Sequence, residues 1–269
     1  MAAANYDLYQ DSFHSAFRSE LDGIVDTLLI PPGGRVLDAP CGNGFYSRRL
    51  AERLDEAGHL TALDENQEYL SLARAAVGTG GDRVNIQKGD VYALPFPDRT
   101  FDLVWCAQSL ISLEAERAVK ELHRVLKAGG MLAILETDEY HHILLPWPVS
   151  LEAALPAALR TASLRRYGDS SKLAPARKLR AILHHCGFAA IRRTTYPFDR
   201  AAPFDDRTVA FLKYHFEFLR TIAYPHLSGE LQLKFDRWID TDAGDGCFRS
   251  EDVELICLNA VYLASPALV

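Results

Sequence analysis

One segment constrains this chain more than any other: residues 36–44, which read VLDAPCGNG. The apolar run ends in a turn that contains two glycines, and a helical pattern begins at Phe45. Such a turn brings unpaired backbone N–H groups close to a ligand, because glycine has no Cβ to keep the ligand away. Asp64 ends the next apolar run, twenty residues after Gly44, where a carboxylate can accept hydrogen bonds from both hydroxyls of a ribose. The sequence therefore predicts a binding site for a nucleoside.

The same segment excludes two common nucleotide motifs. A dinucleotide site requires G-x-G-x-x-G, whereas Gly42 and Gly44 are followed by Phe45, Tyr46 and Ser47. A phosphate-binding P-loop requires G-K-[ST], which is absent. The alternative is an ordinary strand-to-helix turn followed by a helix-capping aspartate. The combination of strand, turn, helix and spaced acid favours the ligand site.

Apolar runs alternate with helical patterns along most of the chain. Seven runs are predicted to be strands: 35–39, 59–63, 84–87, 101–106, 131–135, 188–198 and 253–263. Strands that are separated by helices indicate right-handed crossovers, so we expect an α/β fold with a doubly wound, mostly parallel sheet. Helices are predicted over residues 6–29 and over an aromatic-rich segment, 208–238. Three prolines, Pro146, Pro148 and Pro156, are expected to break the segment after the fifth strand.

Composition narrows the class of protein. Of the 269 residues, 48% are hydrophobic and 24% are charged, which is enough apolar material for a full core. The formal net charge of -7 disfavours non-specific nucleic-acid binding over the whole surface. No basic stretch precedes an apolar run at the start, and no run of about 18 apolar residues occurs, so neither a secretory signal nor a membrane span is predicted. Five scattered cysteines favour a reducing cytoplasm, and no His, Asp or Glu cluster has metal-ligand spacing, so we expect no metal.

Four segments, in order over residues 36–136, resemble the class I S-adenosylmethionine-dependent methyltransferases, particularly those similar to the ubiquinone/menaquinone C-methyltransferases. VLDAPCGNG is similar to D-x-G-C-G-x-G, with Pro40 in place of the first glycine, and LDEN looks like the segment that carries the ribose acid. GDVYALPFPDRTFDLVWC resembles G-D-x-x-x-L-P-F-x-D-x-x-F-D-x-V. RVLKAGGMLAILE resembles R-V-L-K-P-G-G-x-L, with Ala128 in place of proline. The resemblance covers about the first half of the chain.

The resemblance implies a Rossmann-like fold with seven strands, the last antiparallel, and S-adenosylmethionine as cofactor, with S-adenosylhomocysteine as product. It implies that Asp38 and the backbone of the glycine turn hold the methionine part, that Asp64 binds the ribose, and that Asp90 accepts from the adenine amino group. The residues implied to contact the cofactor are Asp38, Cys41, Gly42, Asn43, Gly44, Asp64, Glu65, Asp90, Val91, Cys106, Ala107 and Gln108. Pro40 cannot donate an N–H group, so the turn is expected to differ slightly from the family's.

Methyl transfer from a sulfonium mainly requires alignment of nucleophile, methyl carbon and sulfur, because the leaving group departs neutral. Tyr6, Tyr9 and Phe13 on the leading helix are candidates for aromatic faces near the sulfonium; the alternative is that they only pack on the sheet. A general base is needed only if the nucleophile arrives protonated. His141 and His142, just after the fifth strand, are the candidates, unless they cap a turn or lie in solvent. The candidate catalytic residues are His141, His142 and Gln108.

We expect residues 1–30 to form a helical lid and 31–140 the S-adenosylmethionine-binding core. Residues 141–269 should complete the same domain, with helical cap insertions at 141–172 and 204–245 and the last two strands. The expected function is methyl transfer to a small apolar or aromatic metabolite, by a monomer or homodimer without a nucleic-acid partner, since aromatic residues cluster between the last two strands.

Two alternatives stay open. One is a non-catalytic S-adenosylmethionine-binding sensor, which would bind the cofactor without turnover. The other is an RNA methyltransferase that uses the basic stretch 160–193, which contains nine Lys and Arg residues and one acid.

Overall fold

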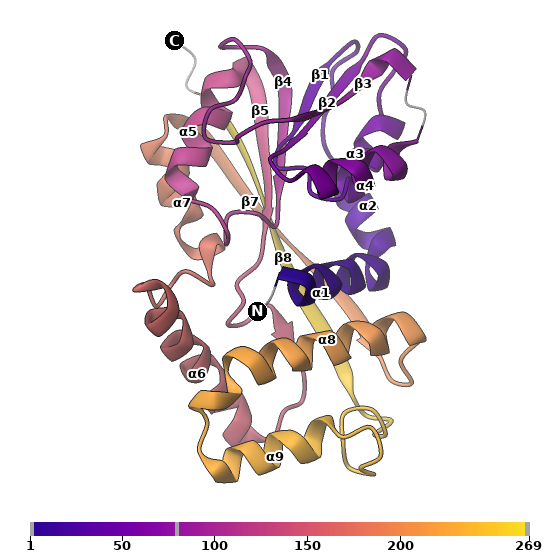
Figure 1. Ribbon diagram of the computed structural model, residues 1–269, viewed down its shortest axis with the longest axis vertical. Helices are drawn as coiled ribbons and strands as arrows, with labels where there is room; N and C mark the ends of the chain where they lie inside the picture. The colour runs from indigo at the N-terminus through magenta and orange to yellow at the C-terminus, as the bar shows by residue number, and fades with distance from the viewer. Residues whose placement is uncertain (1–2, 79–80, 267–269) are drawn as a thin grey trace. The chain divides into compact units, whose positions relative to one another are not determined.

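The computed structural model describes the backbone of residues 3–78 and 81–266, and the side chains of these residues from Asp7 onward (Figure 1). By their internal contacts the residues form two compact units. The first, called here the sheet unit, comprises Ser19–Thr137, Pro175–Tyr196 and Ala260–Val269. The second, called the helical unit, comprises Met1–Arg18, Asp138–Ala174 and Pro197–Asn259. The predicted lid, core and cap insertions remain an interpretation of the domain organisation.

The sheet unit contains the predicted parallel sheet. Its strand order is β3 (Val84–Lys88), β2 (His59–Asp64), β1 (Arg35–Asp38), β4 (Phe101–Ala107), β5 (Leu126–Glu136) and β8 (Glu254–Pro266), and β7 (Phe188–Ala201) also pairs with β8. The first five strands are parallel, and β8 runs antiparallel to β5, with Glu136 opposite Ala260. The α/β fold and the antiparallel last strand are therefore confirmed.

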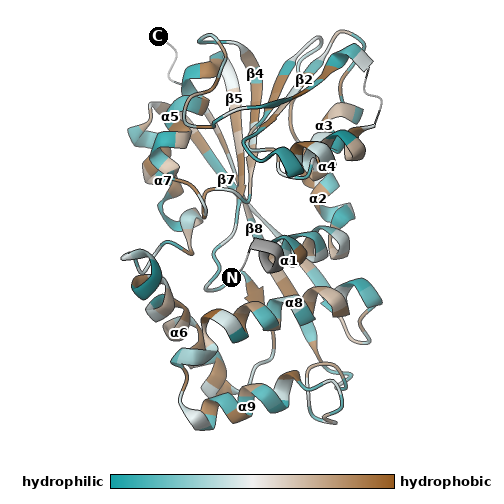
Figure 2. Ribbon diagram, viewed as in Figure 1, coloured by the Kyte–Doolittle hydropathy of each residue, from teal (hydrophilic) through white to brown (hydrophobic). Residues whose placement is uncertain are grey.

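Helices cover both faces of this sheet. They are α2 (Arg18–Asp26), α3 (Phe45–Glu52), α4 (Gln67–Val77), the 3-10 helix η1 (Gly81–Arg83), α5 (Ala115–Val125) and α7 (Pro175–His185). Figure 1 shows α3 and α4 packed together on one side of the strands, and α5 and α7 on the other. The apolar positions Val119, Leu122 and Val125 recur on one face of α5, and all three are fully buried. Figure 2 shows hydrophobic residues along β4 and β5, as expected for strands that are covered on both faces.

The helical unit is formed by segments far apart in the sequence. Its elements are α1 (Ala3–Ala16), β6 (Ile143–Leu144), α6 (Val149–Tyr167), α8 (Asp206–Ile222), the 3-10 helix η2 (Tyr224–His226), α9 (Gly229–Ile239) and the ends of β7 and β8. Helix α1 packs against α8 (Figure 1). The short strand β6 pairs antiparallel with β8, with Ile143 opposite Cys257, and adds an eighth strand to the seven that were predicted. No helix among the described residues has the length and apolar character to cross a membrane.

The structure corrects three details of the predicted helices. The leading segment 6–29 is two helices, not one, and α1 ends where the Arg200 guanidinium donates to the carbonyl of Ala16 at 2.7 Å. The segment 208–238 is interrupted at η2, where Pro225 lies between α8 and α9. Pro156 does not break the chain but lies inside α6, where Leu155 and Leu159 on the buried face offset the loss of one helical hydrogen bond.

Candidate functional site

The turn after β1 is held by the end of β2. These strands are parallel neighbours, with Asp38 opposite Ala62, so their carboxyl ends lie side by side. The Gly42 N–H group donates to the carboxylate of Asp64 at 2.9 Å, and Asn66 N–H donates to its other oxygen at 2.9 Å. The N–H group of Cys41 donates to the carbonyl of Leu63 at 2.9 Å. The structure thus brings together the glycine turn and the spaced acid.

Both glycines of the turn have a backbone conformation that favours glycine, and Gly44 also lacks space for a side chain. Gly42 and Gly44 both have left-handed backbones, with φ of 51° and 81°. A Cβ at Gly44 would lie 2.6 Å from Cα of Ala73, so only glycine allows the turn to approach α4 this closely. A Cβ at Gly42 would meet no atom within 4 Å among the described residues. Asn43 completes the turn, because its side-chain oxygen accepts from Phe45 N–H at 3.1 Å as α3 begins.

Asp38 ends β1 in a buried environment. Its side chain is 1% exposed and accepts a hydrogen bond from the Ser47 hydroxyl at 2.5 Å. The pKa of Asp38 is raised to about 7, mainly by burial; the charge of Asp64 also raises it, and the hydrogen bond from Ser47 lowers it. A positively charged ligand group beside Asp38 would favour its ionised form.

The segment after β4 is fixed by β5 and α3. Gln108 has a left-handed backbone, with φ of 51°, and its N–H group donates to the carbonyl of Leu135 at 2.8 Å. Its side-chain oxygen accepts from the Tyr46 hydroxyl at 3.0 Å. Glu136, which is 1% exposed, accepts from the N–H groups of Ser109 at 2.9 Å and Leu110 at 2.7 Å. These contacts orient the backbone that follows β4, a role that was not predicted for Glu136.

Asp90 belongs to the same edge of the sheet. The N–H group of Gly89, just before it, donates to the carbonyl of Asp64 at 3.0 Å, and the Asp90 carboxylate is exposed and accepts from Tyr92 N–H at 2.8 Å. Val91 is 6% exposed and packs in the core, whereas the side chain of Glu65 is exposed. Asp64 and Asp90 therefore lie at the carboxyl ends of the neighbouring strands β2 and β3.

The two cysteines at this edge, Cys41 and Cys106, are buried. Burial raises the pKa of the Cys41 and Cys106 thiols well above the ordinary value, so both are neutral thiols. Cys106 is fully buried and Ala107 is 9% exposed. Cys106 therefore lacks the exposed, electropositive surroundings of a nucleophilic thiolate.

The site as a whole carries an excess of negative charge. Asp38, Asp64, Asp90 and Glu136 all lie at or just beyond strand ends on one edge of the sheet. Burial raises the pKa of Tyr46 well above its ordinary value, and the charges of Asp38 and Glu136 also raise it. Such a field favours a ligand with a positive charge and donor hydroxyl or amino groups. No group of three His, Cys, Asp or Glu residues in the described part of the chain is arranged to hold a metal ion.

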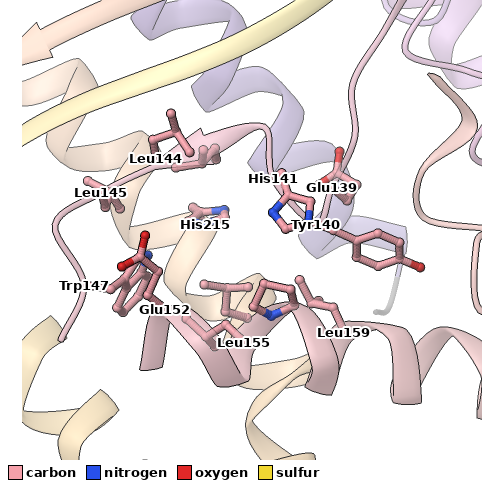
Figure 3. Close-up of a pocket in the computed structure, with 13 residues that line it drawn as sticks. Glu139, Tyr140, His141, Leu144, Leu145, Trp147, Glu152, Leu155, Leu159 and His215 are labelled. Atoms are coloured by element: carbon pink, nitrogen blue, oxygen red, sulfur yellow. The ribbon is translucent and has the colours of Figure 1, made fainter. Parts of the chain in front are cut away.

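The helical unit contains a pocket with a volume of ≈ 110 Å³ (Figure 3). Its walls combine apolar and polar side chains and come from the segment after β5, from α6 and from α8. The lining residues are Glu139, Tyr140, His141, Ile143, Leu144, Leu145, Trp147, Glu152, Leu155, Pro156, Leu159, His215 and Leu219. His141 is exposed at the rim, with its Nε2 atom 3.5 Å from the Arg160 guanidinium.

The other candidates from the sequence lie beside this pocket, within the helical unit. His142 is 4% exposed and lies outside the lining set. Tyr9 is 5% exposed, and its ring stacks between those of Phe211 and Phe218, with centroid distances of 5.8 and 5.6 Å. Phe13 also packs on Phe211, and the Tyr6 side chain lies outside the described residues. The Tyr9 ring therefore packs on α8; its role toward the cofactor remains a prediction.

Sequence reasoning did not single out His215 as a site residue. It lies on the buried face of α8 between Phe211 and Phe218, so its spacing is that of a core position. The available signal was a histidine on an otherwise apolar helix face, which must find a polar partner when buried.

The chain is similar in sequence and in fold to several known proteins. Residues 36–130 match a family described as a methyltransferase domain. A ubiquinone/menaquinone biosynthesis C-methyltransferase of Bordetella avium is 32% identical over 190 residues, which cover 64% of this chain and 73% of the relative. A demethylmenaquinone methyltransferase of Lysinibacillus sphaericus is 34% identical over 113 residues, 42% of this chain and 48% of the relative, so the chain spans about half the length of that protein. The YcgJ protein of Bacillus subtilis has a similar fold, with a TM-score of 0.60 at 16% identity over 93% of this chain and 98% of that one.

Proposed function

The chain belongs to the class I S-adenosylmethionine-dependent methyltransferases, and from this membership we propose that it transfers a methyl group from S-adenosylmethionine to a small apolar or aromatic acceptor. The observation that carries the proposal is the hydrogen bond between Gly42 N–H and the Asp64 carboxylate, which joins the glycine turn to the acid of the next strand. This arrangement supplies, in one place, a glycine turn that lets an amino-acid tail approach the backbone closely and a carboxylate for a ribose.

The donor set at the strand ends fits this cofactor. An ionised carboxylate offers about four acceptor positions, and the N–H groups of Gly42 and Asn66 occupy two of those on Asp64. The remaining positions match the two hydroxyls of a ribose. Asp38 is proposed to pair with the methionine ammonium group, and Asp90 with the adenine amino group. The negative charge of this edge suits a ligand that carries a sulfonium and an ammonium.

The proposed reaction is a direct displacement. When bound, S-adenosylmethionine supplies a methyl group activated by the sulfonium, and the sulfide leaves as a neutral group. The chain's residues therefore have to bind and orient rather than stabilise a new anion. Gln108, held by Tyr46 and by the carbonyl of Leu135, is proposed to orient the methionine part.

The acceptor class is proposed from the pocket of the helical unit. Leucines from three segments form its walls, among them Leu145, Leu155 and Leu219, and the Trp147 ring adds an aromatic face. Such a lining favours an apolar or aromatic ring, with orientation set by the few polar groups. One relative is named as a demethylmenaquinone methyltransferase and another as a C-methyltransferase of ubiquinone/menaquinone biosynthesis, which agrees with a ring as the acceptor.

Calorimetric titration with S-adenosylhomocysteine tests cofactor binding, with Asp64→Asn as the disabling variant and Glu68→Gln, an exposed neighbour, as its matched control. Release of S-adenosylhomocysteine in the presence of hydroquinones and naphthols then tests transfer. Cofactor binding without turnover across such rings would favour the sensor instead. The RNA alternative is tested by RNA binding and its salt dependence. The structure divides its basic stretch 160–193 between the two units, with Arg160 and Arg165 in α6 and Arg177 and Arg180 in α7.

A further inference from the structure

We infer that the pocket of the helical unit binds the acidic hydroxyl of a phenol or enol, and that Nε2 of His215 accepts its proton directly. On the other side of its ring, His215 is supported by a row of Tyr9, His142 and Glu139, called here the relay. The inference rests on the proposed function for the identity of the bound molecule as the methyl acceptor. Its structural basis lies wholly within the helical unit.

Three buried polar groups and the partly buried carboxylate of Glu139 form a continuous row. The Tyr9 hydroxyl lies 3.4 Å from Nδ1 of His215 on one side and 3.4 Å from Nε2 of His142 on the other. Nδ1 of His142 lies 3.7 Å from a carboxylate oxygen of Glu139 and has no hydrogen-bond partner among the described residues. These spacings are long for hydrogen bonds, and catalytic hydrogen bonds commonly shorten when a substrate binds.

The neighbours of each imidazole indicate which of its ring nitrogens carries the proton. A carboxylate beside Nδ1 of His142 favours the tautomer that carries its proton there, so Nε2 accepts from the Tyr9 hydroxyl. The Tyr9 oxygen then accepts from Nδ1–H of His215. Nε2 of His215 is left with a free lone pair, and His215 is the member of the row that, with Glu139, lines the pocket (Figure 3). His215 therefore offers a proton acceptor among the leucines of the pocket wall.

The surroundings of His215 select the kind of hydroxyl. Burial lowers the pKa of His215 well below its ordinary value, and the neighbouring His142 lowers it further, so the imidazole is neutral at pH 7. A base of low pKa removes a proton readily only from an acidic group, which favours a phenol or enol over an aliphatic alcohol. The other ionisable groups that line the pocket are Glu139, Tyr140, His141 and Glu152.

Packing keeps the relay in place. The Tyr9 ring is held between Phe211 and Phe218, with interplanar angles of 19° and 5°. A rigid ring holds its hydroxyl between the two imidazoles without the cost of ordering it when a ligand binds. Tyr9 and His142 are positioning residues in this scheme, because they act through His215.

The proton step is balanced within the site. The O–H bond of the ligand breaks, an N–H bond forms at Nε2 of His215, and the electron pair stays on the oxygen as the nucleophile. The imidazolium that forms keeps its Nδ1 proton toward Tyr9, and the negative charge of Glu139 at the far end of the row stabilises it.

The test uses 4-nitrophenol, whose visible absorption reports its phenolate, with the full chain and without S-adenosylmethionine. We expect the wild-type protein to bind this phenol at least tenfold more tightly than its methyl ether, 4-nitroanisole, and to lower the apparent pKa of the bound phenol. His215→Phe, which keeps a ring in the core, should abolish both effects. Tyr9→Phe should weaken them, whereas Tyr224→Phe, whose hydroxyl bonds Asp236 away from the pocket, should leave them unchanged.

Equal binding of the phenol and its ether, no binding of either, or an unchanged bound-phenol titration in His215→Phe would overturn the inference. Circular dichroism of each variant establishes that it is folded. In the methyl-transfer assay, Tyr9→Phe should change the pH profile of kcat and leave the KM for S-adenosylmethionine within about twofold, which a purely structural role would not produce. Failure of cofactor binding overturns the proposed function alone, because the phenol titration contains no cofactor.

Discussion

The carboxylate of Asp64 accepts the backbone N–H of Gly42 at 2.9 Å, so the end of β2 fixes the turn that follows β1. One residue thus has two tasks: it shapes the turn, and it retains acceptor positions for a ligand. The effect of removing its charge should therefore appear both in cofactor affinity and in the order of the turn.

Asp64→Asn is expected to weaken S-adenosylhomocysteine binding by about 10- to 100-fold, because hydrogen bonds to a charged group contribute about 1.5–3 kcal/mol. Calorimetric titration measures this loss. Glu68→Gln removes a neighbouring exposed charge and should stay within about twofold of the wild type. Equal losses in both variants would show that general charge, not the position of Asp64, controls affinity.

Gly44→Ala is expected to destabilise the fold by about 2–4 kcal/mol, because the new Cβ would lie 2.6 Å from Cα of Ala73 on a backbone with φ of 81°. Gly42→Ala, with open space around its Cβ, should cost only about 1 kcal/mol for its backbone conformation. Gly23→Ala in α2 has neither problem and should stabilise the helix by about 0.5–1 kcal/mol. Urea unfolding of the three variants gives these free energies, and a different order would contradict the close approach seen at Gly44.

Asp38 should make stability depend on pH in the opposite sense to an ordinary salt-bridged carboxylate. Its pKa is raised from 3.8 to about 7 mainly by burial, so between these values the folded chain binds a proton that the unfolded chain does not. The free energy of unfolding should therefore fall as pH rises from about 4 to 7, by up to a few kcal/mol for this group. Asp38→Asn keeps an acceptor for Ser47 and should remove this part of the pH dependence. Parallel pH profiles of the two proteins would show that Asp38 ionises normally.

The strands and the cofactor edge were predictable because their signals are local. A parallel strand covered on both faces is a continuous apolar run, so residues 35–39 and 59–63 predicted β1 and β2 to within one residue. The glycine turn and Asp64 are fixed by spacing along one βα unit. The role of Glu136 was not predicted, because its carboxylate binds the backbone after β4, 26 and 27 residues earlier in the sequence.

The relay in the helical unit could not be predicted in this way. Tyr9 and His215 are separated by 206 positions, and each alone has the pattern of a buried residue on an apolar helix face. Of the two adjacent histidines that were proposed as a base, His142 is buried and His141 is exposed at the pocket rim. Only the packing of α1 on α8 gives His142 and His215 a common partner.

The end of α1 offers a last test, since the apolar spacing of residues 6–29 continues through the break and cannot show it. Arg200 donates to the carbonyl of Ala16 at 2.7 Å, and its guanidinium lies 4.6 Å from the ring centre of the fully buried Phe17. Arg200→Ala should lower the free energy of unfolding by about 1–3 kcal/mol, because a helix-ending hydrogen bond and a cation–π contact are lost together. Arg207→Ala, at an exposed position in the first turn of α8, should change it by less than about 0.5 kcal/mol. If the two variants unfold at the same urea concentration, Arg200 does not stabilise the end of α1, and the break must have another cause.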